Sequence, residues 1–255
     1  NGCWKFVSRV VRGVRSNAAS PFWMQERLRR AGLRPISAIV DITNYVMLEL
    51  GAPMHAYDLR KLHERVNVRF ARAGEKLKLL DGREIDLSPD VLVIADERSI
   101  IGLAGVMGGE DSGIADDTTD VLFECAFFDP DVVAGRGRRY GLITDASQRF
   151  ERGVDPELQE RAIERATRLL LDSAGGKAGP LVVTRAKESY PPPAPIRLRH
   201  QRVEHVLGAK IAAGIVQSLL TRLGMKLSGG PSQWQVTPPT WRFDVRIEED
   251  LIEEV

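Results

Sequence analysis

The segment "DVLFECAFF", residues 120–128, is the stretch of this chain that decides its fold. Without Glu124 its central part would be apolar at odd and even positions alike, a pattern that predicts a strand buried on both faces. Alternation places Glu124 on the same side as Leu122 and Ala126. An ionised carboxylate buried there is costly unless it has a partner. The segment therefore predicts either an ion pair between Glu124 and an arginine, or a carboxylate that faces a polar cavity and waits for a ligand's donor group.

Further strands and several helices surround this segment in the sequence. The range 66–128 is mostly β in pattern, and the Asp81-Gly82 pair within it is a strong hairpin signal. Helical patterns with terminal glycines occupy three other stretches, residues 22–32, 36–50 and 157–176. This mixture predicts the α+β class, with a sheet-rich first part.

A stiff proline-rich segment, "SYPPPAP" at residues 189–195, marks the best domain boundary. We expect one domain over 1–190 and a second, small helical or winged-helix-like domain over 191–255. The chain starts without methionine and stops inside an acidic helical stretch, so we expect a fragment of a longer protein whose small domain is truncated.

The composition of the 255 residues is ordinary, with 43% hydrophobic residues and a net charge of +1. The apolar runs are too short to span a bilayer, and no secretory pattern opens the chain. Cys3 and Cys125 suggest no disulfide framework, which favours a reducing, cytoplasmic compartment. Any contact with nucleic acid must use local patches, because the chain is not basic overall.

Three further places carry candidate chemistry, each with a plain structural alternative. His55 follows the helix that ends at Gly51, on a connector fixed by Pro53, and is either a packed histidine or part of a site. The glycine-rich loop around Gly108 lacks the Gly-Lys-Ser/Thr ending of a phosphate loop, so it is a plain turn or a place where a ligand touches backbone. The arginine-rich residues 136–155 suit phosphate contacts, or form an internally paired surface loop. Thr144 and Ala146 flank Asp145 in this segment and would share a face if it is extended.

The acidic end has helical spacing. Asp250, Glu253 and Glu254 fall at i, i+3 and i+4, with Asp244 just before them. Oxygen ligands at such spacing suit magnesium, although an exposed acidic helix is the commoner interpretation. Zinc is not expected, because the histidines have no partners at zinc spacing.

Several long motifs resemble the beta subunit of bacterial phenylalanyl-tRNA synthetases. They are "LRPISAIVDITNYVMLELGAPMHAYD", "GGEDSG", "LFECAFF", "TDASQRFERGVDP" and "WRFDVRIEEDLIEEV", in the order expected of a central fragment of that subunit. The family's enzyme, an alpha2beta2 heterotetramer, ligates phenylalanine to tRNA(Phe) with ATP. Its beta editing domain hydrolyses tyrosyl-tRNA(Phe) made in error.

The resemblance also implies roles for single residues. Glu124, Gly108 and Ala146 are expected to bind the tyrosyl side chain, and no metal is needed for editing. A catalytic and positioning set is expected to hold the ester end of the substrate and a water: Thr43, Asn44, His55 and Thr144. A magnesium ion shared with the alpha subunit is expected at Asp244, Asp250, Glu253 and Glu254. The alternative function is a non-catalytic scaffold that binds tRNA or assembles subunits.

Overall fold

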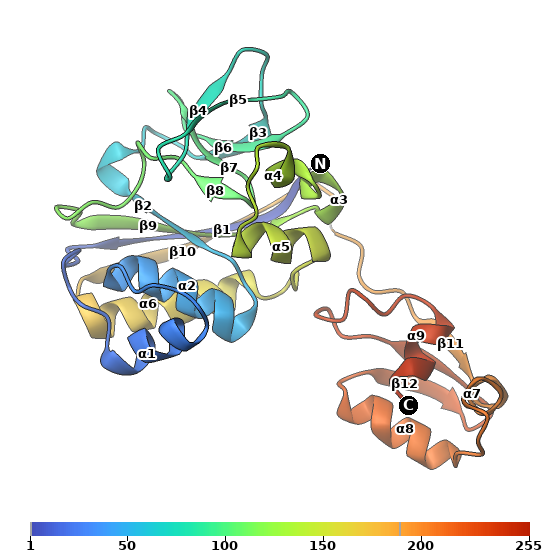
Figure 1. Cartoon of the computed structure of the whole chain (residues 1–255). Helices are drawn as coiled ribbons and strands as arrows, with labels where there is room; N and C mark the ends of the chain where they lie inside the picture. Colours follow the sequence, from blue (N-terminus) through green and yellow to red (C-terminus); the bar gives the residue numbers. More distant parts are fainter. Residues whose placement is uncertain (1, 189) are drawn as a thin grey trace. The chain divides into compact units, whose positions relative to one another are not determined.

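Strand β9 (Asp120–Phe128) is an inner strand of a four-stranded antiparallel sheet, in agreement with its apolar sequence (Figure 1). This computed structural model describes residues 2–188 and 190–255, which form two units, 1–189 and 190–255. The sheet has the order β10-β1-β9-β2 and belongs to the first unit. Its other strands are β1 (Cys3–Arg12), β2 (His55–Asp58) and β10 (Lys177–Arg185).

Three helices cover one face of this sheet, and Figure 1 shows them as one layer: α1 (Phe22–Arg30), α2 (Ala38–Leu50) and α6 (Gln159–Ala174). Phe123 and Cys125 of β9 point into this layer and join its apolar core. Lys5 and Arg9 of β1 share that face, and their buried charges pair with glutamates of α6. Because strand alternation sends these residues to the helices, it sends Glu124 to the opposite face.

That opposite face is covered by a second four-stranded sheet of order β3-β6-β7-β8 (Figure 1). Its strands are β3 (Asn67–Phe70), β6 (Leu92–Ala95), β7 (Ile100–Leu103) and β8 (Met107–Gly108). The two-stranded hairpin of β4 (Lys76–Lys78) and β5 (Glu84–Asp86) lies beside it. Gly82 has φ +83° in the turn of this hairpin, so the hairpin predicted from Asp81-Gly82 is confirmed.

Short helices, rather than a loop, occupy much of the arginine-rich segment. They are α3 (Pro130–Val133), α4 (Arg136–Arg139) and α5 (Asp145–Arg152). The segment around Asp145 is helical rather than extended, so the condition under which Thr144 and Ala146 would share a strand face is not met. Thr144 is the N-cap of α5, where its hydroxyl accepts a hydrogen bond from Ser147 N at 3.0 Å. Some arginines of the segment pair within it, as Arg149 does with Asp145, which the surface interpretation predicts, whereas Arg139 pairs with Asp90 outside it.

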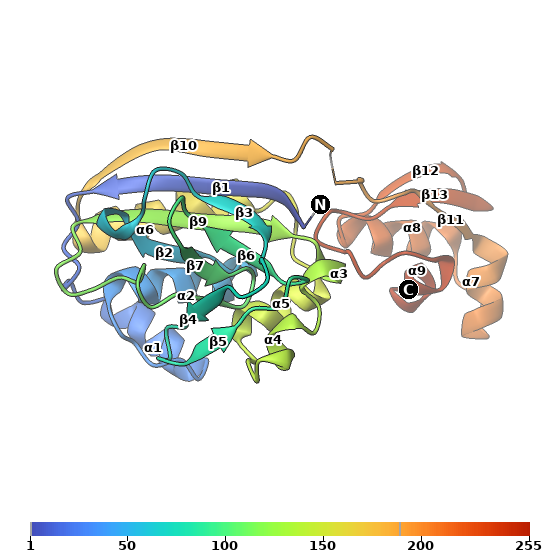
Figure 2. The same cartoon turned by 90° about the horizontal axis from the view of Figure 1, so that it is seen from above.

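The second unit contains a three-stranded antiparallel sheet of order β11-β13-β12 (Figure 2). In chain order its elements are β11 (Ile196–Arg199), α7 (His200–Leu207), α8 (Ala213–Arg222), β12 (Lys226–Gly230), β13 (Gln233–Thr237) and α9 (Glu248–Glu253). Leu198, Leu220 and Trp234 are central in its separate apolar core. The helix pair followed by a β-hairpin fits a winged-helix-like unit, and the α+β class is confirmed for the chain. Among the described helices, none combines the length and apolar character needed to cross a bilayer.

Candidate functional site

A cavity of about 80 Å³ lies in the first unit, bordered by β2, the β7–β8 turn, β9 and α5. Glu124 and His55 are polar groups in its wall, together with the hydroxyl of Tyr57. Most of the remaining wall is apolar, made by Ile94, Leu103, Val106, Met107, Phe128 and Phe150. This is the composition of a small-ligand site, in which a few polar groups set the orientation of a mostly apolar ligand.

His55 and Glu124 belong to neighbouring strands and face each other directly. In the antiparallel register of β2 with β9, His55 is the partner of Glu124 and Tyr57 is the partner of Leu122. Alternation along β2 puts His55 and Tyr57 on one face, so both reach the cavity beside Glu124. The expectation that His55 lies on a connector is wrong, because His55 is the first residue of strand β2.

Glu124 is 4% exposed, and its partner is not an arginine but the phenol of Tyr57. The Tyr57 hydroxyl donates to Oε2 of Glu124 at 2.5 Å. Burial raises the pKa of Glu124 to about 7, and the hydrogen bond from Tyr57 opposes that rise. Burial raises the pKa of Tyr57 well above its ordinary value, and the nearby Glu124 adds to this, so its hydroxyl remains a donor.

His55 is held by packing rather than by hydrogen bonds. Its ring meets that of Tyr57 edge to face, with 4.4 Å between centroids, and its Nε2 is buried with no hydrogen-bond partner among the described residues. Burial lowers the pKa of His55 to about 4, so the imidazole is neutral at pH 7. A neutral imidazole of such low basicity suits a wall that orients a ligand better than a strong general base.

The imidazole of His55 leaves no space for a side chain at position 108. A Cβ atom added to Gly108 would lie 2.5 Å from Cε1 and 2.6 Å from Nε2 of the imidazole, closer than packed atoms approach. The backbone of Gly108 is therefore in contact with the ring, and both line the cavity. The sequence led us to expect that Gly108 leaves space for a ligand, and the structure shows that it also leaves space for His55.

Ala146 lines the cavity from the first turn of α5, and Thr144 sets the position of that turn. The Thr144 hydroxyl donates to the carbonyl of Val106 at 2.9 Å, which joins α5 to the β7–β8 turn. Thr144 does not itself line the cavity in the described chain, but it is hydrogen-bonded to Val106 and lies two positions before Ala146, and both of these residues line it.

Thr43 and Asn44 lie elsewhere. Both are in α2, within the helical layer on the far side of the sheet from β7 and β8 (Figure 1). Thr43 is buried, and its hydroxyl donates to the carbonyl of Val40 at 2.8 Å. Neither residue is in the cavity wall of the described chain. The structure thus brings His55, Gly108, Glu124 and Ala146 together and leaves Thr43 and Asn44 apart.

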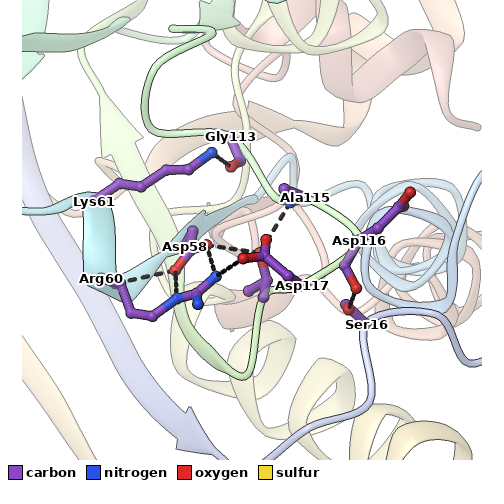
Figure 3. A network of polar contacts seen from close by, with 9 residues as sticks. Ser16, Asp58, Arg60, Lys61, Gly113, Ala115, Asp116 and Asp117 are labelled. Atoms are coloured by element: carbon purple, nitrogen blue, oxygen red, sulfur yellow. Dashed lines mark hydrogen bonds and ion pairs between the residues drawn. The ribbon is translucent and has the colours of Figure 1, made fainter.

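A polar network at the end of β2 anchors the strand that carries His55 and Tyr57 (Figure 3). Asp58 is fully buried, and it accepts hydrogen bonds from Arg60 Nη2 at 2.9 Å and from Thr118 at 2.8 Å. Arg60, in the short 3₁₀ helix η1 (Leu59–Lys61), also reaches Asp117 at 3.2 Å. Burial raises the pKa of Asp58, but the hydrogen bonds from Arg60 and Thr118 outweigh it and the pKa falls below its usual value. The network ties β2 to the loop that leads into β9.

The acidic end does not form a metal centre in the described residues. Arg242 lies between Asp244 and Glu254, with contacts of 2.8 Å and 2.5 Å, so its guanidinium takes the place that a cation would need. Asp250 accepts the backbone N–H groups of Arg246 and Ile247 at the start of α9. Among the described residues, no group of three or more His, Cys, Asp or Glu side chains is placed to hold a metal ion. Magnesium binding at the acidic end therefore stays a prediction, and the described positions of these side chains do not fit it.

Tyr57 is the residue of the cavity that sequence reasoning missed. It stands in the quoted "HAYD", two residues after His55, and the period of a strand would have put both on one face. The missing information was that these residues form a strand at all, and that this strand pairs with β9.

Two family models match the chain, one for each unit. The B3/4 domain matches residues 2–175, and the tRNA synthetase B5 domain matches residues 196–255. The phenylalanine–tRNA ligase beta subunit of Methylococcus capsulatus is 54% identical over 253 residues, which is 99% of this chain and 32% of that protein. The same subunit of Photorhabdus laumondii is 51% identical with the same coverage. The chain thus spans about a third of the length of these relatives.

A solved N-terminal fragment of the phenylalanyl-tRNA synthetase beta subunit from Pyrococcus horikoshii is a distant structural neighbour. It is 14% identical, with a TM-score of 0.46, and the match covers 98% of this chain and 69% of that one. The resemblance to bacterial beta subunits rests instead on the two domain matches and the close relatives, which confirm it. The chain belongs to the B3/4 domain family, and a tRNA synthetase B5 domain follows in its second unit.

Proposed function

We propose that the first unit is the editing site of a phenylalanyl-tRNA synthetase beta chain and hydrolyses tyrosyl-tRNA(Phe). The observation that carries this proposal is a buried carboxylate with one oxygen available in a mostly apolar cavity. Oε2 of Glu124 accepts the hydroxyl of Tyr57. Oε1 has no hydrogen-bond partner among the described residues and is not fully buried. Oε1 can therefore be reached from the cavity that Glu124 lines.

This arrangement distinguishes tyrosine from phenylalanine by a hydroxyl group. An apolar pocket rejects an added hydroxyl only by about a hundredfold, whereas a site built to bind one rejects the analogue that lacks it far more strongly. A tyrosyl hydroxyl would donate to Oε1 of Glu124. A phenylalanyl ring would displace water and leave the carboxylate without that donor, so correctly charged tRNA would be spared.

The size of the cavity sets a requirement on its walls. A closed cavity of roughly 150 Å³ holds benzene, so the present volume of about 80 Å³ admits a phenol only if the walls move. Met54 and Met107 are flexible members of the wall. In this proposal they change rotamer when a tyrosyl side chain enters.

The hydrolytic step needs positioning more than strong base catalysis, because the aminoacyl ester is already activated. A water adds its oxygen to the ester carbonyl carbon, the bond to the ribose oxygen breaks, and that oxygen takes a proton. His55 would orient the substrate or this water as a neutral group, and Thr144 would support it through α5. Thr43 and Asn44 are assigned to the ester end by the resemblance alone, since both lie in α2, outside the cavity wall of the described chain.

The same proposal implies two partners. They are tRNA(Phe), whose 3′ end would carry the mischarged amino acid, and an alpha subunit that makes the aminoacyl ester with ATP in an alpha2beta2 enzyme. Magnesium binding at the acidic end, if it occurs, would require Arg242 to leave Asp244 and Glu254.

Release of tyrosine from tyrosyl-tRNA(Phe) tests the proposal. The wild-type chain and Glu124→Gln are compared both alone and within the complete alpha–beta enzyme, with phenylalanyl-tRNA(Phe) as the second substrate. We expect hydrolysis of the tyrosyl ester by the wild type and a loss of preference in Glu124→Gln. Activity in the complete enzyme alone would locate the missing element in tRNA delivery. No tyrosyl hydrolysis in either form would overturn the proposal.

A scaffold function is the second candidate, and three features of the second unit favour it. That unit has its own core, matches the B5 domain, and presents acidic and basic side chains that are paired with each other, such as Arg199 with Glu248. Deletion of residues 190–255 separates the two functions. A scaffold role predicts that the shortened chain still hydrolyses tyrosyl-tRNA(Phe) but no longer assembles with the alpha subunit.

A further inference from the structure

We propose that Tyr57 is a positioning residue for substrate selection, which holds Oε2 of Glu124 so that Oε1 alone is presented to the tyrosyl hydroxyl. This inference rests on the proposed editing function, and it concerns a residue for which the resemblance implies no role. The two hydroxyls, one from the protein and one from the substrate, would donate to the two oxygens of the same carboxylate.

The geometry gives Glu124 a single fixed orientation. Its described side-chain hydrogen bond is the one from Tyr57, at 2.5 Å, in a pair that is 0% and 4% exposed. Without that donor the carboxyl group would turn freely about its last torsion, since no arginine or lysine is bound to it. Tyr57 therefore fixes the plane of the carboxylate and occupies one of its two equivalent oxygens, which leaves the other for the cavity.

The ring of Tyr57 is itself held on several sides. His55 packs against it edge to face, at 4.4 Å between centroids. The Tyr57 hydroxyl lies 3.8 Å from the position that a Cβ of Gly102 would take, so the β7 backbone closes the space behind it. The Asp58 network anchors the following residue of β2. These contacts leave the phenol little freedom, as a positioning group requires.

The hydrogen bond also favours the ionised form of Glu124. It acts against the effect of burial on this carboxyl group, which would otherwise be more fully protonated at neutral pH. An ionised acceptor makes a stronger hydrogen bond with the substrate hydroxyl than a neutral one does. Tyr57 thus acts twice on selection, by orientation and by charge.

The test uses a probe that needs neither tRNA nor hydrolysis. Adenosine carrying tyrosine or phenylalanine through a non-hydrolysable 3′-amide is titrated into the wild-type chain, Tyr57→Phe and Tyr45→Phe, and the ratio of the two dissociation constants is measured. Tyr45→Phe is the matched control, because it removes the hydroxyl of a buried tyrosine of α2, which is bound to Arg27 of α1 and Glu49 of α2 and lies outside the cavity wall. Thermal unfolding of all three proteins is recorded beside the titrations.

We expect Tyr57→Phe to lower the preference for the tyrosyl amide by about tenfold, the effect of one hydrogen bond to a charged group. Binding of the phenylalanyl amide should be nearly unchanged, and Tyr45→Phe should keep the wild-type ratio. A merely structural role would weaken both amides together. A wild-type chain without preference would overturn the editing proposal itself, whereas a preference that survives in Tyr57→Phe would overturn only the role of Tyr57.

A structure of the wild-type chain with the tyrosyl amide gives a second test that does not depend on the folding of a variant. The proposal requires the ligand hydroxyl on Oε1 of Glu124 while the Tyr57 hydroxyl remains on Oε2. A ligand hydroxyl that displaces Tyr57 from the carboxylate would contradict it.

Discussion

His55 and Glu124 are direct cross-strand partners in β2 and β9, and burial shifts their two pKa values in opposite directions. The pKa of His55 falls from 6.5 to about 4, and that of Glu124 rises from 4.5 to about 7. At neutral pH the pair therefore carries at most the charge of one partly protonated carboxylate. This arrangement limits the cost of placing two ionisable groups in one apolar cavity.

The pair makes a prediction about stability and pH. As pH falls from 6.5 toward 4, the unfolded His55 takes a proton first, so its contribution to the free energy of unfolding is lost. As pH falls from 7 to 4.5, Glu124 takes up a proton in the folded protein before it does so in the unfolded chain, so its contribution to the free energy of unfolding is gained. The two effects, each up to about 3 kcal/mol, nearly cancel in the wild type. Glu124→Gln removes one of them, and denaturant unfolding should show a steeper loss of stability on acidification than in the wild type. Parallel stability curves for the two proteins would show that the pair is not shifted in this way.

Ala146→Trp should block the cavity. Ala146 lines a space of about 80 Å³ from the first turn of α5, and an indole there fills it. We expect loss of tyrosyl-tRNA(Phe) hydrolysis and of tyrosyl-amide binding, and a loss of about 1–3 kcal/mol in the unfolding free energy, because an indole is larger than the space and overpacks its walls. Gln148→Trp is the control, since it adds the same side chain at an exposed position of the same helix. Normal clearance of tyrosyl-tRNA in Ala146→Trp would mean that the cavity is not the editing pocket.

His55→Ala separates a wall from a general base. A histidine whose pKa is about 4 is a poor proton acceptor, so we expect weaker binding of the tyrosyl amide and a fall in kcat of less than about tenfold. His63→Ala, outside the cavity wall, is the comparison. General-base catalysis contributes roughly 10²–10⁴-fold. A loss of that size in kcat, with substrate binding unchanged, would assign His55 the role of base.

Asp58→Asn tests the anchor of β2. The substitution keeps the shape of a buried side chain but removes the charge that Arg60 binds, so we expect a loss of about 1–2 kcal/mol in urea unfolding. Preference for the tyrosyl amide should also fall, because Tyr57 is the preceding residue of the strand. Asp117→Asn changes the exposed partner of Arg60 and should have little effect. Equal losses of unfolding free energy in the two variants would mean that the charge of Arg60, which binds both carboxylates, stabilises the fold more than the buried charge of Asp58 does.

The sequence revealed Glu124 because a carboxylate inside an apolar strand is a local anomaly. It could not reveal Tyr57 in the same way, since a buried aromatic in a strand is ordinary and its partner lies 67 positions away. Strand β2 itself is only His55–Asp58, too short for a period of two to stand out, which explains why His55 was expected on a connector.

Two other errors have local physical causes. The segment around Asp145 was expected to be a surface loop because its arginines and glycines conceal a short helix, although Thr144 and Ser147 already have the spacing of a capping pair. The acidic end has helical spacing, but α9 starts at Glu248 and uses Asp250 to cap its own first turn. Spacing alone did not show that Arg242 would bind Asp244 and Glu254.

The contact between Gly108 and His55 has a genetic consequence. A methyl group at position 108 would overlap the imidazole, so Gly108→Ala alone should be strongly deleterious. The overlap ends when the ring is removed, so the same change should be far milder in a His55→Ala background. Tolerance of a side chain at 108 is then conditional on the residue at 55, whereas position 55 can change while Gly108 is kept.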